Sequence, residues 1–171
     1  MESEEDKEII NIGRMALSAR VYPEHIIEEI KVMKSTKGII LYGDGINYKV
    51  VGDKLAKKWH DITVVKIING LDVYNENFEQ QILMIFHDAE NDQRLQDWRN
   101  LHIIVIGHFE AIFGANNSEL EAEKIAKNLI ILKQEELDNI LIVGIVNNKN
   151  DIDENILTQG KFDVEIEFGA S

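Results

Sequence analysis

Short apolar runs alternate along the chain with segments in which apolar residues recur at every third or fourth position. The runs are 38–42 (GIILY), 62–68 (ITVVKII), 101–106 (LHIIVI) and 139–146 (NILIVGIV), followed by 162–168 (FDVEIEF), in which apolar and acidic residues alternate. Runs that are apolar throughout predict strands covered on both faces, whereas strict alternation predicts a strand with one face in water.

The intervening segments carry the spacing of amphipathic helices. They are 4–19, 24–33 after the only proline, 50–59, 75–98 and 118–133, the last with Ser118 as its expected cap. Strands that alternate with helices favour a three-layer α/β domain built on a mainly parallel sheet. Because no repeat or low-complexity linker interrupts the pattern, residues 1–171 are expected to form one domain.

Charge and composition narrow the functional classes. The chain has 31 acidic and 18 basic residues, for a formal net charge of -13, and such a balance repels phosphate backbones. Nucleic acid is therefore not expected as the main contact. The chain has no cysteine, and its five histidines lack the spacing of a metal site, so no metal is expected.

The chain also lacks the sequence signals of membrane insertion and secretion. Its apolar runs are far shorter than the roughly 20 residues of a membrane span. The acidic start, MESEED, has neither the basic beginning nor the apolar core of a signal peptide. These features predict a cytoplasmic protein without membrane insertion.

Residues 41–50 (LYGDGINYKV) lie between the first predicted strand and a helix, which is the context of a phosphate-binding loop. Such loops read G-x-x-x-x-G-K-[ST], because glycine lets the backbone approach phosphate and the hydroxyl holds magnesium. Gly43 and Lys49 match the pattern, whereas Tyr48 replaces the second glycine and Val50 replaces the hydroxyl residue. The sequence therefore predicts a phosphate loop altered at several positions.

The segments around this loop are more specific than the loop itself. They are RVYPEHIIEEI (20–30), KGIILYG (37–43), LHIIVIGHFEAI (101–112), NILIVGIVNNKNDIDENI (139–156) and GKFDVEIEFG (160–169). In their order and spacing, the chain from about Asp6 to Gly169 resembles the first ATPase domain of the N-ethylmaleimide-sensitive fusion ATPase (NSF) family, AAA+ proteins that disassemble SNARE complexes. The resemblance implies a P-loop AAA+ large subdomain with a parallel sheet in the strand order 5-1-4-3-2.

Positions that carry ATP chemistry in that family are changed here. Ile46 and Tyr48 stand where the family has glycines, and Asp44 adds a negative charge beside the expected triphosphate. Gly107 and His108 stand where the family has the acids that help hold magnesium and polarise water. The resemblance thus implies a degenerate nucleotide site, with remnants at Gly43, Asp44, Gly45, Ile46, Asn47, Tyr48, Lys49, Val50, Gly107, His108, Asn147 and Lys161.

Other positions correspond to the residues with which the family senses the γ-phosphate and reaches the site of a neighbouring subunit. Asn147 keeps the polar residue with which the family senses the γ-phosphate. Thr158 and Lys161 align with arginines that the family projects into a neighbour's site, and lysine lacks the planar fork of arginine. These changes predict that hydrolysis in trans is lost as well.

Two mechanical parts of the family also differ. Between 66–73 (KIINGLDV) and 74–82 (YNENFEQQI) the chain is shorter than the family pattern, which implies the loss of most of the loop that grips substrate in the central pore. The family's helical lid follows the last strand, and the chain is expected to have no lid subdomain. Together these features predict a protein that is not an enzyme, binds no cofactor, and acts as a protein-binding or regulatory module.

Two alternatives stay open. The chain could be a residual NSF-type subunit in a mixed AAA+ ring for SNARE disassembly and vesicle fusion. It could instead be an inhibitory or dormancy-type factor docked on a large assembly such as the ribosome or proteasome, where a net charge of -13 would suit basic protein surfaces. The expected partners are accordingly an NSF-like ATPase, the SNARE machinery or such an assembly.

Overall fold

The computed structural model describes residues 37–58, 61, 63–115, 120–162 and 164–167. The two helices predicted over 4–19 and 24–33 lie outside the described residues, as does the expected cap Ser118.

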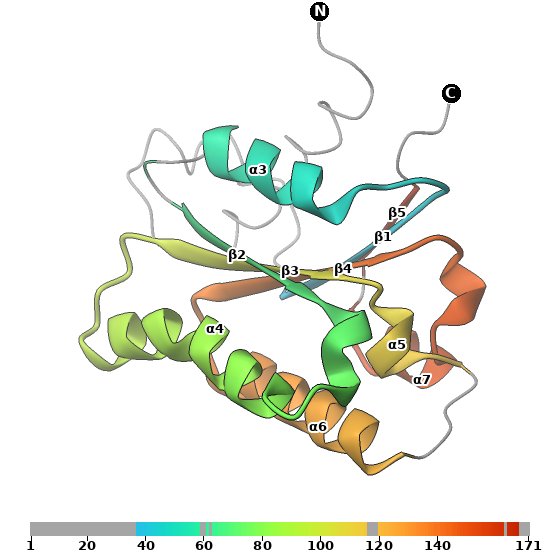
Figure 1. The fold of residues 1–171 in the computed structure, drawn as a ribbon. Helices are drawn as coiled ribbons and strands as arrows, with labels where there is room; N and C mark the ends of the chain where they lie inside the picture. Colours follow the sequence, from blue (N-terminus) through green and yellow to red (C-terminus); the bar gives the residue numbers. More distant parts are fainter. Residues whose placement is uncertain (1–36, 59–60, 62, 116–119, 163, 168–171) are drawn as a thin grey trace, which may run out of the picture.

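All five predicted strands form one parallel sheet. The strands are β1 (Gly38–Tyr42), β2 (Thr63–Asn69), β3 (Leu101–Gly107), β4 (Ile140–Val146) and β5 (Val164–Glu167). Their order in the sheet is β2-β3-β4-β1-β5, which confirms the order 5-1-4-3-2. Because the strands are parallel, their carboxyl ends meet at one edge of the sheet, where α/β proteins place their ligands (Figure 1).

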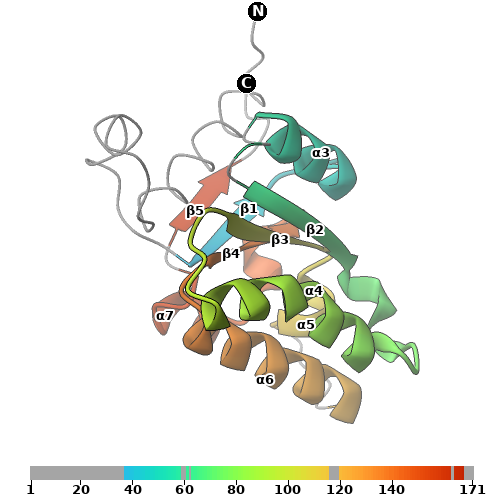
Figure 2. The same ribbon diagram turned by 90° about the vertical axis from the view of Figure 1, so that its left-hand side faces the viewer.

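Helices cover both faces of this sheet (Figures 1 and 2). Among the described residues, the helix α3 (Tyr48–Lys58) covers one face, and the long helices α4 (Phe78–Arg94) and α6 (Glu121–Glu136) lie side by side on the other. The predicted three-layer α/β architecture is therefore confirmed.

Shorter helical turns connect these elements. They are η1 (Gly70–Tyr74), α5 (Glu110–Phe113), η2 (Lys149–Asp151) and α7 (Glu154–Thr158). The helix predicted over 75–98 was too long, because η1 and a short loop precede its first turn at Phe78 and its last turn ends at Arg94. The side chain of Asn69 starts η1 by accepting a hydrogen bond from the backbone N–H of Leu71 (3.0 Å).

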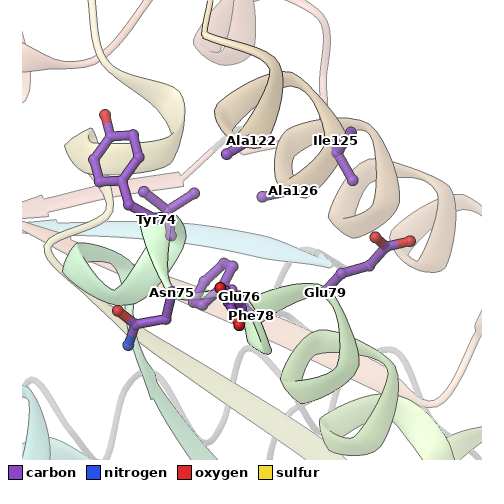
Figure 3. Close-up of a pocket in the computed structure, with 9 residues that line it drawn as sticks. Tyr74, Asn75, Glu76, Phe78, Glu79, Ala122, Ile125 and Ala126 are labelled. Atoms are coloured by element: carbon purple, nitrogen blue, oxygen red, sulfur yellow. The ribbon is translucent and has the colours of Figure 1, made fainter.

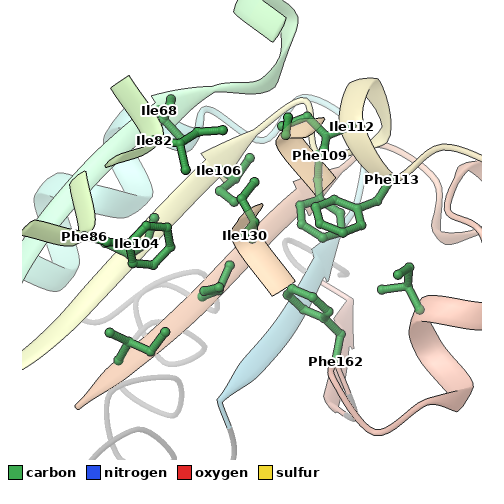
Figure 4. Close-up of a cluster of buried hydrophobic side chains, with 14 of the residues drawn as sticks. Ile68, Ile82, Phe86, Ile104, Ile106, Phe109, Ile112, Phe113, Ile130 and Phe162 are labelled. Atoms are coloured by element: carbon green, nitrogen blue, oxygen red, sulfur yellow. The ribbon is translucent and has the colours of Figure 1, made fainter. Parts of the chain in front are cut away.

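The central strands carry the core. Every residue of β3 and β4 is buried, whereas residues of β5 alternate between half-buried and exposed, as their pattern predicted. On the α4 and α6 side, Phe109 stacks on Phe113 with ring centroids 4.4 Å apart and meets Phe162 edge to face at 5.0 Å. Figure 4 shows these three rings beside aliphatic side chains of the sheet and helices. This cluster fixes the segment that follows β3, where part of the candidate site lies.

Candidate functional site

The loop after β1 is attached to the carboxyl end of β4. The backbone N–H of Gly43 donates to the carbonyl oxygen of Val146 across 3.2 Å. Gly45 has a φ of +72°, a left-handed conformation that favours glycine, and it lies on an exposed turn with Asp44. The loop therefore lies at the ligand-binding edge of the sheet, as the sequence predicted.

Asn47 begins α3 by capping its first turn. Its side-chain oxygen accepts from the backbone N–H groups of Lys49 (3.0 Å) and Val50 (3.3 Å), and its carbonyl accepts from Val51 (3.1 Å). The first N–H groups of a helix have no partner within the helix, and in phosphate-binding loops they point at the anion. In this structure the asparagine satisfies two of them.

The ring of Tyr48 lies against Gly107 at the end of β3. A Cβ atom at position 107 would lie 2.3 Å from Cδ1 of Tyr48, so only glycine leaves room for the ring as it is placed. The same ring meets the imidazole of His108 edge to face, with centroids 6.1 Å apart. The two changes at 48 and 107 are thus complementary in space, a contact that the sequence reading missed.

His108 follows β3 in a left-handed conformation, with a φ of +49°. Its side chain is exposed, and its Nδ1 lies 3.6 Å from Oε1 of Glu110, the first residue of α5. His108 is therefore a surface residue of the turn that follows β3. Glu110 has a second carboxylate oxygen, Oε2, that is buried without a hydrogen-bond partner among the described residues.

Several predicted site residues surround one small cavity of about 30 Å³. Its lining comprises Ile46, Tyr48, His108, Glu110, Ile145, Val146 and Asn147. We refer to it as the Tyr48 cavity. A space of this size holds about one water molecule. The Tyr48 ring thus takes up space beside the loop that follows β1.

Lys49 and Val50 do not line the Tyr48 cavity. Both are exposed, and Lys49 lines a second hollow of about 500 Å³ beside β2, together with the acidic residues Asp53 and Asp72; Tyr48 borders this hollow as well. The lysine is therefore placed at the exposed surface of α3.

Lys161 lies near the amino end of β1, whereas the Tyr48 cavity lies at the carboxyl ends of the strands. Its carbonyl oxygen accepts from Nε2 of Gln134 (2.7 Å), which also donates to the carbonyl of Lys37 (3.3 Å) just before β1. Its ammonium pairs with Glu135 at 2.6 Å. The structure therefore does not bring Lys161 to the Tyr48 cavity of its own chain, and its interpretation as a residue facing a neighbour stays a prediction.

In the described part of the chain, no group of three or more histidine, aspartate or glutamate residues is arranged to hold a metal ion. None of the helices within the described ranges has the length and apolar character needed to cross a membrane.

Comparison with known sequences decides the family. The model of the ATPase family associated with various cellular activities (AAA) matches residues 48–170, beginning at Tyr48. The chain belongs to the AAA family. It is an NSF-like AAA domain, because the vesicular-fusion protein SEC18 of Saccharomyces cerevisiae is 30% identical to it over 173 residues, covering 95% of this chain.

Further relatives agree with this assignment. The vesicle-fusing ATPase of Caenorhabditis elegans is 31% identical over 177 residues and 95% of the chain. An AAA ATPase forming ring-shaped complexes, from Kocuria rhizophila, is 29% identical over 167 residues and 85% of the chain. The AAA domain described here spans only 23% of the length of SEC18, 21% of the C. elegans protein and 28% of the K. rhizophila protein.

These comparisons correct one prediction. The sequence reading predicted a protein that is not an enzyme, whereas the matched family is one of ATPases and the relatives are named as vesicle-fusing ATPases. The prediction was wrong because it inferred activity from motif letters alone.

Proposed function

We propose that this AAA domain binds other proteins and works as a regulatory component or subunit of an NSF-type AAA+ assembly. The observation that carries the proposal is the extent of the similarity, since 95% of the chain aligns with SEC18. All five strands are in place, in the order 5-1-4-3-2. A rigid sheet of this kind holds its surface side chains in fixed positions, as protein recognition requires.

The relatives suggest the setting. SEC18 and the vesicle-fusing ATPases are named for vesicle fusion, and the relative from K. rhizophila is named for ring-shaped complexes. We extend both properties to this chain as a proposal: it joins a ring with an NSF-like ATPase that acts on the SNARE machinery. Lys161 lies away from the Tyr48 cavity and pairs with Glu135, and its role toward a neighbouring chain is part of this proposal, taken from the resemblance.

A second candidate is an inhibitory or dormancy-type factor on a large assembly. The observation in its favour is the net charge of -13, which suits the basic proteins of a ribosome. The two candidates differ in the partner that they require.

Purification of the tagged full chain from its native source at low salt, followed by quantitative mass spectrometry, tests both. We expect an NSF-like ATPase or SNARE proteins to be enriched over a tag-only control. Enrichment of ribosomal or proteasomal proteins without these would favour the second candidate. Recovery of the chain alone would contradict both.

A further inference from the structure

A groove opens between η1, the start of α4 and the start of α6 (Figure 3). Its volume is about 240 Å³, and its lining comprises Val73, Tyr74, Asn75, Glu76, Phe78, Glu79, Ala122, Ile125 and Ala126. We call it the η1–α6 groove. None of its residues lines the Tyr48 cavity, so the two sites are built from separate parts of the chain.

The groove combines a buried apolar floor with exposed apolar walls. Val73, Phe78 and Ala126 are almost fully buried. Above them, Tyr74 is 58% exposed and Ile125 is 39% exposed, although both carry large apolar surfaces. Figure 3 shows Tyr74 and Ile125 well apart, with Ala122 and Ala126 projecting from α6 between them. Small side chains on the helix thus leave room that a partner's side chain could fill.

The rim of the groove is acidic. Glu76 and Glu79 are exposed and belong to its lining, and Glu123 accepts a hydrogen bond from the hydroxyl of Tyr74. No lysine or arginine occurs among the described residues that line the groove. Lys124 and Lys127, which are also on α6, do not line the groove. Apolar contact and negative potential therefore coincide here.

The size of the groove favours a protein side chain over a small molecule as its ligand. Its volume of about 240 Å³ is smaller than the roughly 300–1,000 Å³ of most sites for small molecules. It is sufficient for one or two protein side chains that insert as an anchor. A second copy of this chain would bring the same acidic rim and a net charge of -13, so self-association is opposed by like charge.

We propose that the η1–α6 groove binds a basic segment of a partner protein, which inserts an aliphatic or aromatic side chain between Tyr74 and Ile125. Lysine or arginine residues that flank this anchor pair with Glu76 and Glu79. The inference rests on the proposed function in that the chain acts through protein contacts, and it adds the surface and the chemistry of the partner.

Selection from a random peptide-display library on the purified full chain tests the proposal. We expect enriched peptides to combine an apolar anchor with lysine or arginine on either side. Their affinity, measured by fluorescence anisotropy with the enriched peptide itself, should fall as salt is raised, because exposed charge pairs are screened. Failure to enrich any peptide, or enrichment of acidic or uncharged peptides, would overturn the proposal.

Matched variants locate the binding surface. Ala122→Trp fills the groove and should weaken binding about tenfold or more, since anchor residues dominate such interfaces. Leu132→Trp is the control, because Leu132 lies on the same helix, is 46% exposed and does not line the groove. Equal binding to both variants would contradict the placement.

A charge-reversal variant tests the acidic rim without filling the groove. Glu76→Lys combined with Glu79→Lys alters two exposed side chains, so the fold should be retained. Selection on this variant should favour acidic flanks around the same anchor. Continued preference for basic peptides would overturn the assignment of the rim. Because these assays need no native partner, the groove can fail while the proposed assembly is confirmed, and the reverse.

Discussion

The Tyr48 cavity and the η1–α6 groove lie on the same domain but differ in how side chains fill them. At the first, a tyrosine ring rests on Gly107 and leaves about 30 Å³. At the second, Ala122 and Ala126 face exposed Tyr74 and leave about 240 Å³. The Tyr48 cavity is therefore nearly filled by side chains of its own chain, whereas the groove keeps room for a side chain of a partner.

The two regions also differ in what fixes them. The segment after β3 is held by Phe109, which is fully buried and packs on two other phenylalanines and on Gly144. The walls of the groove, Tyr74 and Ile125, are exposed, so replacing them should disturb the packing of the core little. Changes in the first region should therefore alter stability, and changes in the second should alter partner binding.

The largest expected effect concerns the core behind the Tyr48 cavity. Phe109→Ala removes a fully buried ring, and a cavity of that kind should lower the free energy of unfolding by about 3–5 kcal/mol. Denaturant unfolding measures the change. Leu83→Ala on α4, where the side chain is 40% exposed, serves as the control and should cost far less. Similar losses for both would show that the phenylalanine cluster does not anchor this region.

Next in size is the effect of the Tyr48 ring on nucleotide. Tyr48→Ala enlarges the cavity and removes the cost of displacing a half-buried ring, so affinity for ATP with magnesium should rise about tenfold, equivalent to about 1.4 kcal/mol. Isothermal titration measures it. Tyr48→Phe keeps the ring and should leave the affinity unchanged. An alanine variant no tighter than the parent would mean that the ring does not limit access.

A smaller effect is expected at the start of α3. Asn47→Ala removes the acceptor for two backbone N–H groups and should lower stability by about 1 kcal/mol. Asn47→Asp restores an acceptor at the same position and should recover most of the loss. Thermal unfolding measures both variants, and equal melting temperatures for the alanine variant and the parent would contradict the capping role.

The smallest effect on stability should occur in the groove. Tyr74→Ser removes a side chain that is 58% exposed and a surface hydrogen bond to Glu123, so the free energy of unfolding should change by less than about 1 kcal/mol. The same variant should weaken binding of the selected basic peptides. A large loss of stability would mean that Tyr74 is part of the core and not a docking residue.

The strands of the sheet could be predicted from the sequence, because each strand has a recognisable pattern of apolar residues within its own segment. β3 and β4 are apolar throughout, and β5 alternates, so their burial could be predicted without tertiary information. Short elements gave no such signal. The helices α5 and α7 contain 4 and 5 residues, which is too few for a helical period to show.

The site was predicted only in part, for a physical reason. The sequence predicted that Gly43, Tyr48, Gly107 and Asn147 lie close together, because they lie at or after the carboxyl ends of β1, β3 and β4, and parallel strands bring these ends to the same edge of the sheet. The sequence did not reveal that the Tyr48 ring rests on Gly107, since this contact depends on the side-chain direction. The η1–α6 groove was missed because its walls come from three separate segments.

The most direct test compares partner capture by three forms of the tagged full chain from its native source: the parent, Ala122→Trp and Tyr48→Ala. Quantitative mass spectrometry measures the proteins that co-purify at low salt. We expect Ala122→Trp to lose the partners that the parent enriches, while Tyr48→Ala retains them. Retention by the groove variant and loss by the Tyr48 variant would contradict the assignment of the η1–α6 groove as the partner surface.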